Sequence, residues 1–431
     1  MFRKAYKTLL DWKNSKDRKP LVIMGARQVG KTYLANIFGK NEYQSVIYCM
    51  LEGNEELQSC FETLDCSVII DKISRVKKTK IVKNEMLIIL DEIQSCPKAL
   101  TSLKMFCEQE KDYHIIALGS LLGIATHRDS FSYPVGKVNQ MEMFPLDFEE
   151  FLLAYEQEEL VEKIKKSYRE DLCLDETYHN IAIDFYKKYL FVGGMPEIVK
   201  SYIDNENEEL VTIKQNEIIN QYLSDMNKYN TESEKGKTQL IYKNISRQLA
   251  KENKKFKYSL IKSSARARDY EESIEWLELA GIVNKINRLE QIKLPLNIYS
   301  SISDFKLYMS DVGLLTALGN LKYEDIGSKN ELLNDFMGGL VENYSFNQLR
   351  YNKLNLYYWV YDNSAEVDFI TRIVDDIIPI EVKSGYRTRS KSLNKYIESF
   401  NPAYAIRVSE KNFGFENGIK SVPLYAVFCV N

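Results

Sequence analysis

The residues with the clearest chemical meaning form the stretch Gly25-x-x-x-x-Gly30-Lys31-Thr32. The glycines let the backbone curl so that successive N–H groups point inward and bind anions. Lys31 adds a positive charge for the β- and γ-phosphates, and Thr32 offers a hydroxyl to Mg²⁺. The pattern predicts a phosphate-binding loop, and the residues expected to bind the nucleotide are Gly25, Ala26, Arg27, Gln28, Val29, Gly30, Lys31, Thr32 and Tyr33.

Two neighbouring carboxylates follow an apolar run further along the chain. The run Met86-Leu-Ile-Ile-Leu90 predicts a buried parallel strand that delivers Asp91 and Glu92 at its carboxyl end. Asp91 is suited to hold Mg²⁺ through water together with Thr32, and Glu92 is suited to polarise the attacking water. An apolar run followed by an acid is common at strand ends, but here it follows a complete phosphate-binding loop.

Another apolar strand, His114-Ile-Ile-Ala-Leu118, ends close to Ser120. A small polar residue at this point is expected between the phosphate-binding strand and the acid-bearing strand. Ser120 is therefore our candidate for sensing the γ-phosphate, and it joins Lys31 and Glu92 as a predicted catalytic residue. The alternative is a serine that only closes a turn.

A separate set of acids and one lysine lies near the carboxyl end of the chain. Glu342 is the acid on a helix predicted over 338–349, and Asp368 and Glu381 belong to two strands joined by a turn. Side chains alternate along a strand, so Glu381 and Lys383 point to the same face. We expect Glu342, Asp368 and Glu381 to bind Mg²⁺, and Asp368, Glu381 and Lys383 to act in metal-assisted phosphodiester hydrolysis. The alternative is an ordinary solvated Glu–Lys pair.

Hydrophobic periodicity predicts the strands and helices that position these residues. In the first part of the chain, strands are predicted over 21–24, 46–50, 86–90, 114–118 and 138–143, with a helix over 33–38. Near the carboxyl end, strands are predicted over 356–360, 366–370 and 377–383. Apolar strands that alternate with helices predict an α/β fold with a parallel sheet around the phosphate-binding loop.

The middle of the chain is predominantly helical. Residues 151–230 alternate apolar and charged types at helical spacing, and Gly193-Gly194 and Pro196 interrupt them in a structural role. Helices over 240–250, 258–265 and 269–280, followed by a strand from 281, predict a winged helix. Its connecting stretch is basic and would engage DNA phosphates through Lys251, Lys254, Lys255, Lys257, Lys262, Arg266 and Arg268. The third helix is acidic, so a purely structural winged helix is the alternative.

Bulk composition limits the class of protein. The chain has 431 residues, 45% of them hydrophobic and 28% charged, which is ordinary for a globular protein of several domains. A formal net charge of -3 argues against polyanion binding over the whole surface. The seven cysteines form no CxxC pair, which indicates reduced thiols in the cytoplasm and no zinc site. We see no signal peptide and no apolar run long enough to span a membrane.

These motifs together resemble a family of prokaryotic AAA-type ATPases that carry a C-terminal domain of unassigned function. The segments that carry the resemblance are Gly25 to Thr32, Leu90-Asp-Glu-Ile-Gln94, Gly119-Ser120 and Pro145-Leu-Asp-Phe-Glu-Glu-Phe-Leu152. The family usually has Gly-Arg where this chain has Gly136-Lys137. If that arginine is a finger, Lys137 is a weaker substitute and Arg128 is another donor, so the finger stays unassigned.

The C-terminal set, with Asp368, Glu381-x-Lys383 and the helix acid Glu342, resembles the core of the PD-(D/E)xK nuclease superfamily. The two resemblances imply four segments: an AAA-type P-loop ATPase domain over 1–150, a helical connector over 151–235, a winged-helix domain over 236–330 and a nuclease-like, restriction-endonuclease-like α/β domain over 331–431.

The predicted function is that of an ATPase that binds ATP and Mg²⁺ and acts on DNA through its winged helix and C-terminal domain. That domain is expected to be of the Mg²⁺-dependent phosphodiesterase type, with its activity left open. The alternative is a nucleotide-driven switch or signalling ATPase whose C-terminal domain is a degenerate, non-catalytic binding module. A location in the cytoplasm, away from membranes, is expected in either case, and the sequence leaves the oligomeric state open, with a homo-oligomer as one option.

Overall fold

The computed structural model describes residues 1–120, 122–127, 133–251, 254–328, 330–362, 365–385 and 391–431. These residues divide into two compact units. The N-terminal unit comprises residues 2–144 with 279–281, and the C-terminal unit comprises Met1, 145–278 and 282–431. The division into four segments stays a prediction.

The N-terminal unit is built on a five-stranded sheet in the order β2-β3-β4-β1-β5. Every neighbouring pair of strands is parallel, which confirms the predicted α/β class for this unit. The strands are β1 (Leu21–Met24), β2 (Ser45–Met50), β3 (Met86–Asp91), β4 (His114–Gly119) and β5 (Asn139–Glu142). Because the strands are parallel, the loops that follow them lie at the same edge of the sheet. The loops after β1, β4 and β3 are neighbours there, since β4 lies between the other two strands.

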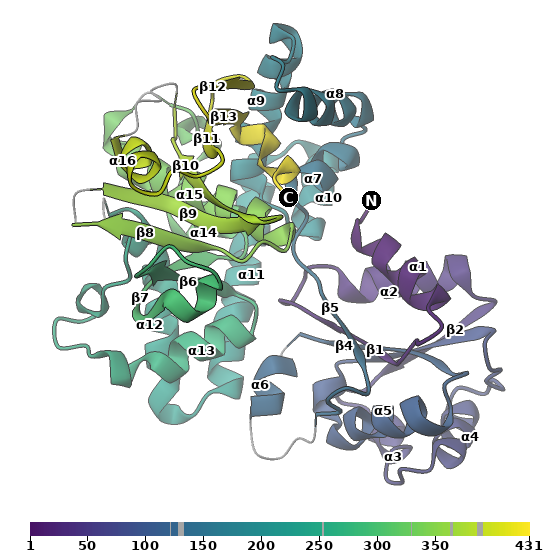
Figure 1. Cartoon of the computed structure of the whole chain (residues 1–431). Helices are drawn as coiled ribbons and strands as arrows, with labels where there is room; N and C mark the ends of the chain where they lie inside the picture. Colours follow the sequence, from purple (N-terminus) through teal and green to yellow (C-terminus); the bar gives the residue numbers. More distant parts are fainter. Residues whose placement is uncertain (121, 128–132, 252–253, 329, 363–364, 386–390) are drawn as a thin grey trace. The chain divides into compact units, whose positions relative to one another are not determined.

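Helices cover both faces of this sheet (Figure 1). On one face lie α1 (Ala5–Asn14) and α2 (Lys31–Glu42), and on the other lie α3 (Glu55–Ser59), α4 (Cys66–Val76) and α5 (Pro97–Gln109). A short helix, α6 (Leu122–His127), follows β4. Every residue of β3 and β4 is buried, as expected for strands that are covered on both faces.

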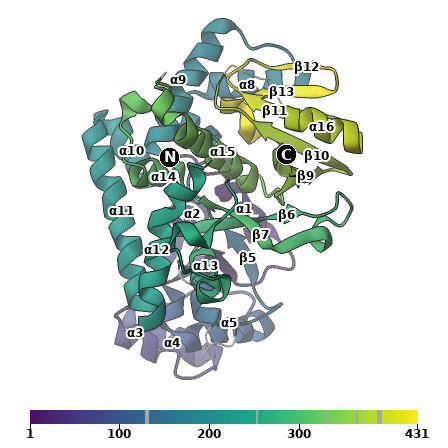
Figure 2. The same ribbon diagram turned by 90° about the vertical axis from the view of Figure 1, so that its left-hand side faces the viewer.

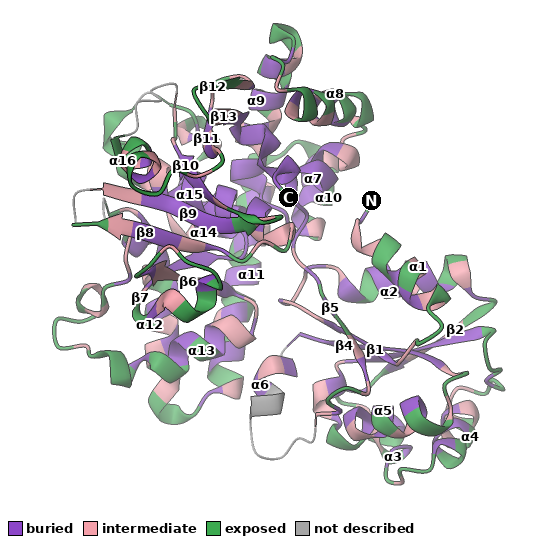
Figure 3. Cartoon of the chain, in the orientation of Figure 1, coloured by how far each residue is buried: buried purple, intermediate pink, exposed green. Residues whose placement is uncertain are grey.

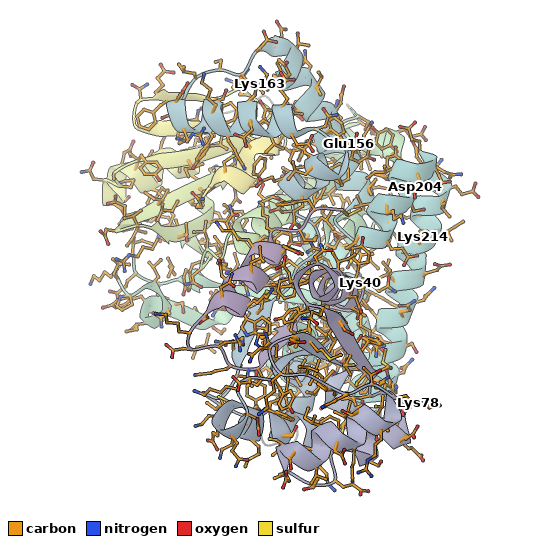
Figure 4. All side chains as sticks on the ribbon, turned by 90° about the vertical axis from the view of Figure 1, so that its right-hand side faces the viewer. Lys40, Lys78, Glu156, Lys163, Asp204 and Lys214 are labelled. Atoms are coloured by element: carbon orange, nitrogen blue, oxygen red, sulfur yellow. The ribbon has the colours of Figure 1, made fainter. Side chains whose placement is uncertain are left out.

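The first part of the C-terminal unit is helical, as the periodicity predicts. Its helices are α7 (Phe148–Ala154), α8 (Glu158–Glu170), α9 (Glu176–Val192), α10 (Pro196–Asn205), α11 (Glu208–Tyr229) and α12 (Glu232–Leu249). The two longest of these helices, α11 and α12, lie side by side (Figure 2). Charged side chains such as Lys163 on α8 and Lys214 on α11 lie on the outside of these helices (Figure 4), and Lys214 pairs with Glu197 at 2.6 Å. Among the described residues, none of the helices combines the length and apolarity that a membrane crossing requires.

The Gly-Gly-x-Pro segment has the structural role that the sequence suggests. Gly193 has a φ of 76°, and a Cβ there would lie 2.4 Å from Oδ1 of Asp311. Asp311 caps helix α14 (Val312–Leu318) and accepts hydrogen bonds from the N–H groups of Leu314 at 2.9 Å and Gly194 at 2.7 Å. Asp311 therefore ties the end of α9 to the start of α14.

Some of the elements predicted for a winged helix form, and one does not. Helix α13 (Glu271–Leu279) leads into the antiparallel pair β6 (Val283–Leu289) and β7 (Ser300–Met309). The helix predicted over 258–265 is wrong, because only a 3₁₀ turn at Tyr258–Leu260 forms there. Ser263 and Ser264 follow this turn, and serine side chains compete with the backbone for the hydrogen bonds of a helix.

An eight-stranded mixed sheet forms the rest of the C-terminal unit, in the order β12-β13-β11-β10-β9-β8-β6-β7. The remaining strands are β8 (Tyr357–Tyr361), β9 (Ala365–Ile373), β10 (Asp376–Val382), β11 (Ala405–Ser409), β12 (Gly414–Glu416) and β13 (Ile419–Pro423). A parallel pairing of β6 with β8 joins the hairpin to the later strands, so the sheet crosses the predicted boundary at 330. The unit also contains α15 (Asn334–Tyr351), which is buried along most of its length (Figure 3), and α16 (Lys391–Phe400).

Candidate functional site

The phosphate-binding loop connects β1 to α2 and requires glycine at both ends. Gly25 has a φ of 144°, and a Cβ there would lie 2.1 Å from the carbonyl oxygen of Met143. Gly30 adopts the left-handed conformation with a φ of 92° directly before α2. The two glycines therefore permit a tight curl that ends at a helix N-terminus, where backbone N–H groups are available for phosphate.

Lys31 lies folded over this loop. Its ammonium group donates hydrogen bonds to the carbonyl oxygens of Gly25 at 2.9 Å and Ala26 at 2.8 Å. Burial lowers the pKa of Lys31 from 10.5 to about 8, although Glu92 and Asp91 partly oppose the shift. The lysine is thus held at the loop by weak acceptors, which phosphate oxygens can replace.

The remaining loop residues differ in their surroundings. Ala26 and Val29 are buried beneath the loop, Gln28 adopts a positive φ of 67°, and Tyr33 is 58% exposed. Arg27 points its guanidinium towards Ser120, with 3.4 Å between Nε and Oγ. Backbone rather than side-chain contacts are therefore the main contribution of Ala26, Gln28 and Val29.

Asp91 is the centre of a hydrogen-bond network at the end of β3. Its Oδ2 accepts from the hydroxyl of Thr32 at 2.7 Å and from the hydroxyl of Tyr48 at 2.8 Å, and its Oδ1 accepts from the N–H of Glu92 at 2.9 Å. Three donors fix the orientation of the carboxylate beside the loop. The sequence analysis missed Tyr48, whose signal was its place on the strand that pairs with the acid-bearing strand.

Glu92 and Ser120 also lie together, as the strand order predicts. The hydroxyl of Ser120 donates to the Glu92 carboxylate at 3.1 Å, and the side-chain amide of Gln94 donates to the same oxygen. Glu92 has a left-handed backbone with a φ of 52°. A strained backbone and two side-chain donors together fix the orientation of this carboxylate.

One of the two finger candidates, Lys137, lies among the described residues. Lys137 forms an ion pair with Glu108 at 2.7 Å, and Arg128 lies outside the residues that the structure describes. The finger stays unassigned.

The C-terminal acids converge in the C-terminal unit. Glu342 lies on α15, Asp368 on β9 and Glu381 on β10, and the Lys383 ammonium donates to Glu381 at 2.5 Å. Asp368 Oδ2 accepts from the backbone N–H of Val382 at 2.8 Å. The four residues predicted from the sequence therefore share one site.

Four further residues, which the sequence analysis did not assign to this site, complete the C-terminal cluster. They are Lys254, Lys306, Tyr308 and Glu366. Lys306 is fully buried on β7, and its ammonium lies 2.9 Å from Glu342 Oε1 and 2.5 Å from Glu366 Oε1. A lysine within the apolar segment Phe305-Lys-Leu-Tyr-Met309 was the available signal, because buried lysines are almost always paired.

Charges within the cluster shift each other strongly. Burial alone would raise the pKa of Glu342, but the ammonium groups of Lys254 and Lys306 hold it well below its usual range. Burial, together with the charges of Glu342 and Glu381, raises the pKa of Asp368 well above its usual value.

The basic stretch predicted to contact DNA is divided by the fold. The Lys254 ammonium lies 2.7 Å from Glu342 Oε2 in the acid cluster, so the prediction that Lys254 faces DNA is wrong. Lys255 pairs with Asp304 and stays partly exposed, and its contact with DNA stays a prediction. The members that lie on the surface are Lys251, Lys257, Lys262, Arg266 and Arg268.

Three family models match parts of the chain. Residues 17–152 match a family described as an AAA domain. Residues 183–325 and 337–427 match two families described as domains of unknown function, DUF8612 and DUF4143. A comparison with curated proteins found no match.

Solved structures resemble the chain only distantly. The Walker-type ATPase PABY2304 of Pyrococcus abyssi is 16% identical, with a TM-score of 0.44, over 74% of this chain and 95% of that chain. The Aeropyrum pernix ORC1 protein, solved in complex with DNA, is 12% identical, with a TM-score of 0.27, over 74% and 91%. AMPPCP-bound DnaA from Aquifex aeolicus is 16% identical, with a TM-score of 0.30, over 64% and 89%. Likenesses of this size do not establish a common fold over the matched length.

The relation of the N-terminal unit to AAA domains therefore depends on the family model and on the geometry of this unit. The matched segment contains the phosphate-binding loop, Asp91 and Glu92 on one parallel sheet. Residues 17–152 therefore match an AAA domain and contain a phosphate-binding loop in its strand–loop–helix setting.

Proposed function

We propose that the N-terminal unit binds ATP with Mg²⁺ and hydrolyses it. The observation that carries the proposal is the 2.7 Å hydrogen bond between the hydroxyl of Thr32 and Oδ2 of Asp91, directly beside the phosphate-binding loop. A hydroxyl and a carboxylate at this distance are the hard oxygen donors that suit Mg²⁺. When bound, the ion would neutralise charge on the β- and γ-phosphates.

Residues of the chain itself would bind the phosphates and activate the attacking water. Backbone N–H groups of the loop bind phosphate oxygens, and the Lys31 ammonium exchanges the carbonyls of Gly25 and Ala26 for them. Glu92 accepts a proton from the attacking water, and Ser120 orients the Glu92 carboxylate through the 3.1 Å hydrogen bond.

The test of nucleotide binding is Lys31→Ala measured by calorimetry with ADP and Mg²⁺. Its matched control is Lys40→Ala, which changes an exposed lysine on the same helix (Figure 4). We expect binding to be lost in Lys31→Ala and kept in Lys40→Ala. Equal affinity of Lys31→Ala and the wild type would contradict the proposal.

For the C-terminal unit we propose a binding module that does not cleave, coupled to the ATPase as a nucleotide-driven switch. We also propose that its fold is related to that of the PD-(D/E)xK nuclease superfamily. The convergence of four residues supports this relation, namely Glu342, Asp368, Glu381 and Lys383. Glu342, Glu366 and Asp368 offer carboxylate oxygens that all lie within 4.8 Å of one another. Oxygens of this kind are the ligands that a divalent metal ion prefers. The charges do not fit Mg²⁺, because the Lys306 ammonium already contacts two of these carboxylates.

Cleavage of plasmid and single-stranded DNA, with Mg²⁺ or Mn²⁺ and with or without ATP, tests this second proposal. We expect no cleavage by the wild type under any of these conditions. Cleavage that disappears in Lys383→Ala would restore the predicted phosphodiesterase.

DNA is the partner that we propose for the middle of the chain. Four exposed cations follow one another there, namely Lys257, Lys262, Arg266 and Arg268. Reversing the charge of the first three should weaken DNA binding and reduce its salt dependence. The control reverses Lys78 (Figure 4) and Lys80, which are exposed and follow α4, and should leave the DNA affinity and its salt dependence unchanged. Unchanged DNA affinity after the triple reversal would rule out this surface.

A further inference from the structure

A fully buried lysine lies among the C-terminal acids. Lys306 reaches the cluster from β7, and its side chain has 0% exposure. Its ammonium bonds Glu342 and Glu366 and also lies 5.0 Å from the centre of the Tyr358 ring. We infer that the Lys306 ammonium is the resident cation of this cluster and occupies the place that a divalent metal would need.

The positions of the oxygens support this inference. Within the part of the chain that the structure describes, Glu342, Glu366 and Asp368 have carboxylate oxygens close enough together to hold one ion. An ion that coordinates Glu342 Oε1 and Glu366 Oε1 together needs the space between them. The Lys306 ammonium occupies that space, at 2.9 Å from the first oxygen and 2.5 Å from the second. The other oxygen of Glu342 is held by Lys254 at 2.7 Å.

The charge balance points the same way. The cluster holds four carboxylates, Glu342, Glu366, Asp368 and Glu381, and three ammonium groups, Lys254, Lys306 and Lys383. Counted with Asp368 ionised, their formal sum is one negative charge, and the raised pKa of Asp368 favours its neutral form and brings the sum towards zero. Either sum leaves little attraction for a divalent ion, and removal of Lys306 makes the sum one unit more negative.

The resident ammonium also explains the architecture around it. Lys306 connects β7 to α15 through Glu342 and to β9 through Glu366. Tyr308, on the same strand, donates to the Glu342 oxygen that Lys306 contacts, at 2.5 Å. The acid cluster thus connects the β6–β7 hairpin to α15 and β9 through buried ion pairs and needs no added metal to do so.

Counting bound Mn²⁺ on the full chain tests the inference, which concerns the C-terminal unit alone and does not depend on ATP hydrolysis. Free Mn²⁺ is measured by electron paramagnetic resonance for the wild type, Asp368→Asn, Lys306→Met and the double variant. Any ion held at the phosphate-binding loop is common to all four and cancels in the differences. Lys255→Met, which removes an ammonium paired outside the cluster, is the control.

We expect the wild type and Asp368→Asn to bind equal numbers of ions. Lys306→Met should gain one Mn²⁺ per chain, the double variant should lose it again, and Lys255→Met should match the wild type. The inference is overturned if the wild type binds one ion more than Asp368→Asn, or if folded Lys306→Met gains none. Should Lys306→Met not fold, the comparison of the wild type with Asp368→Asn still decides. The inference shares its premise with the binding-module proposal, but the readouts differ: a wild type that binds the extra ion without cleaving DNA would overturn the inference and leave the binding module standing.

Discussion

Nucleotide affinity should fall above about pH 8, where ligand-free Lys31 loses its proton. Burial lowers the pKa of Lys31 from 10.5 to about 8. In the complex, phosphate oxygens replace two backbone carbonyls around the ammonium and raise its pKa again, so binding above pH 8 requires uptake of a proton. The dissociation constant should be constant below pH 8 and then rise about tenfold per pH unit, to about thirtyfold at pH 9.5.

Calorimetric titration of the chain with ADP and Mg²⁺ between pH 7 and 10 measures this dependence. Lys31→Arg is the control, because a guanidinium stays charged over the whole range and should give weaker but constant affinity. Wild-type affinity that stays constant to pH 10 would refute the reasoning. An equal decline in Lys31→Arg would refute it as well, since another group would then be titrating.

Three further changes test the two sites and the core. Tyr48→Phe removes one donor from Asp91 and should raise the activation free energy by about 1.5–3 kcal/mol, which lowers kcat/KM for Mg²⁺·ATP by about 10- to 160-fold; steady-state kinetics at fixed Mg²⁺ would show it. Lys306→Met leaves buried carboxylates uncompensated and should lower the free energy of unfolding in urea by about 3–5 kcal/mol. The partly exposed Lys255→Met should cost at most about 1 kcal/mol, and equal losses would contradict the account. Burial raises the pKa of Asp311 from 3.8 to about 6. Between these two pH values the folded state therefore holds a proton that the unfolded chain releases. The wild type should therefore lose up to about 3 kcal/mol relative to Asp311→Asn between pH 4 and 7 in the same assay, and parallel profiles would contradict this.

The nucleotide site could be predicted because its parts are local. The phosphate-binding loop is one continuous strand, turn and helix, and Asp91 and Glu92 directly follow an apolar strand. The placement of Ser120 needed only the assumption that β4 lies between β1 and β3, which the sheet order confirms. Tyr48 was missed because its contact with Asp91 depends on how β2 pairs with β3, and no motif marks that register.

The C-terminal cluster could be predicted only in part, because its cations come from distant segments. Lys306 lies 36 residues before Glu342 in the chain, and the pairing of β6 with β8 that brings its hairpin into the sheet has no local signal. Lys254 was assigned to a DNA-binding surface because its neighbours are basic, whereas the fold turns it towards Glu342. A basic run alone does not tell which of its members face solvent.

Hydrolysis of ATP by Glu92→Gln, measured next to its affinity for ATP, tests the central claim most directly. Gln keeps the size of the side chain but cannot accept the proton of the attacking water. The account predicts ATP affinity close to that of the wild type and a hydrolysis rate lower by about 10²–10⁴-fold, with ATP trapped on the protein. Hydrolysis at the wild-type rate would contradict the role of Glu92 and with it the proposed mechanism.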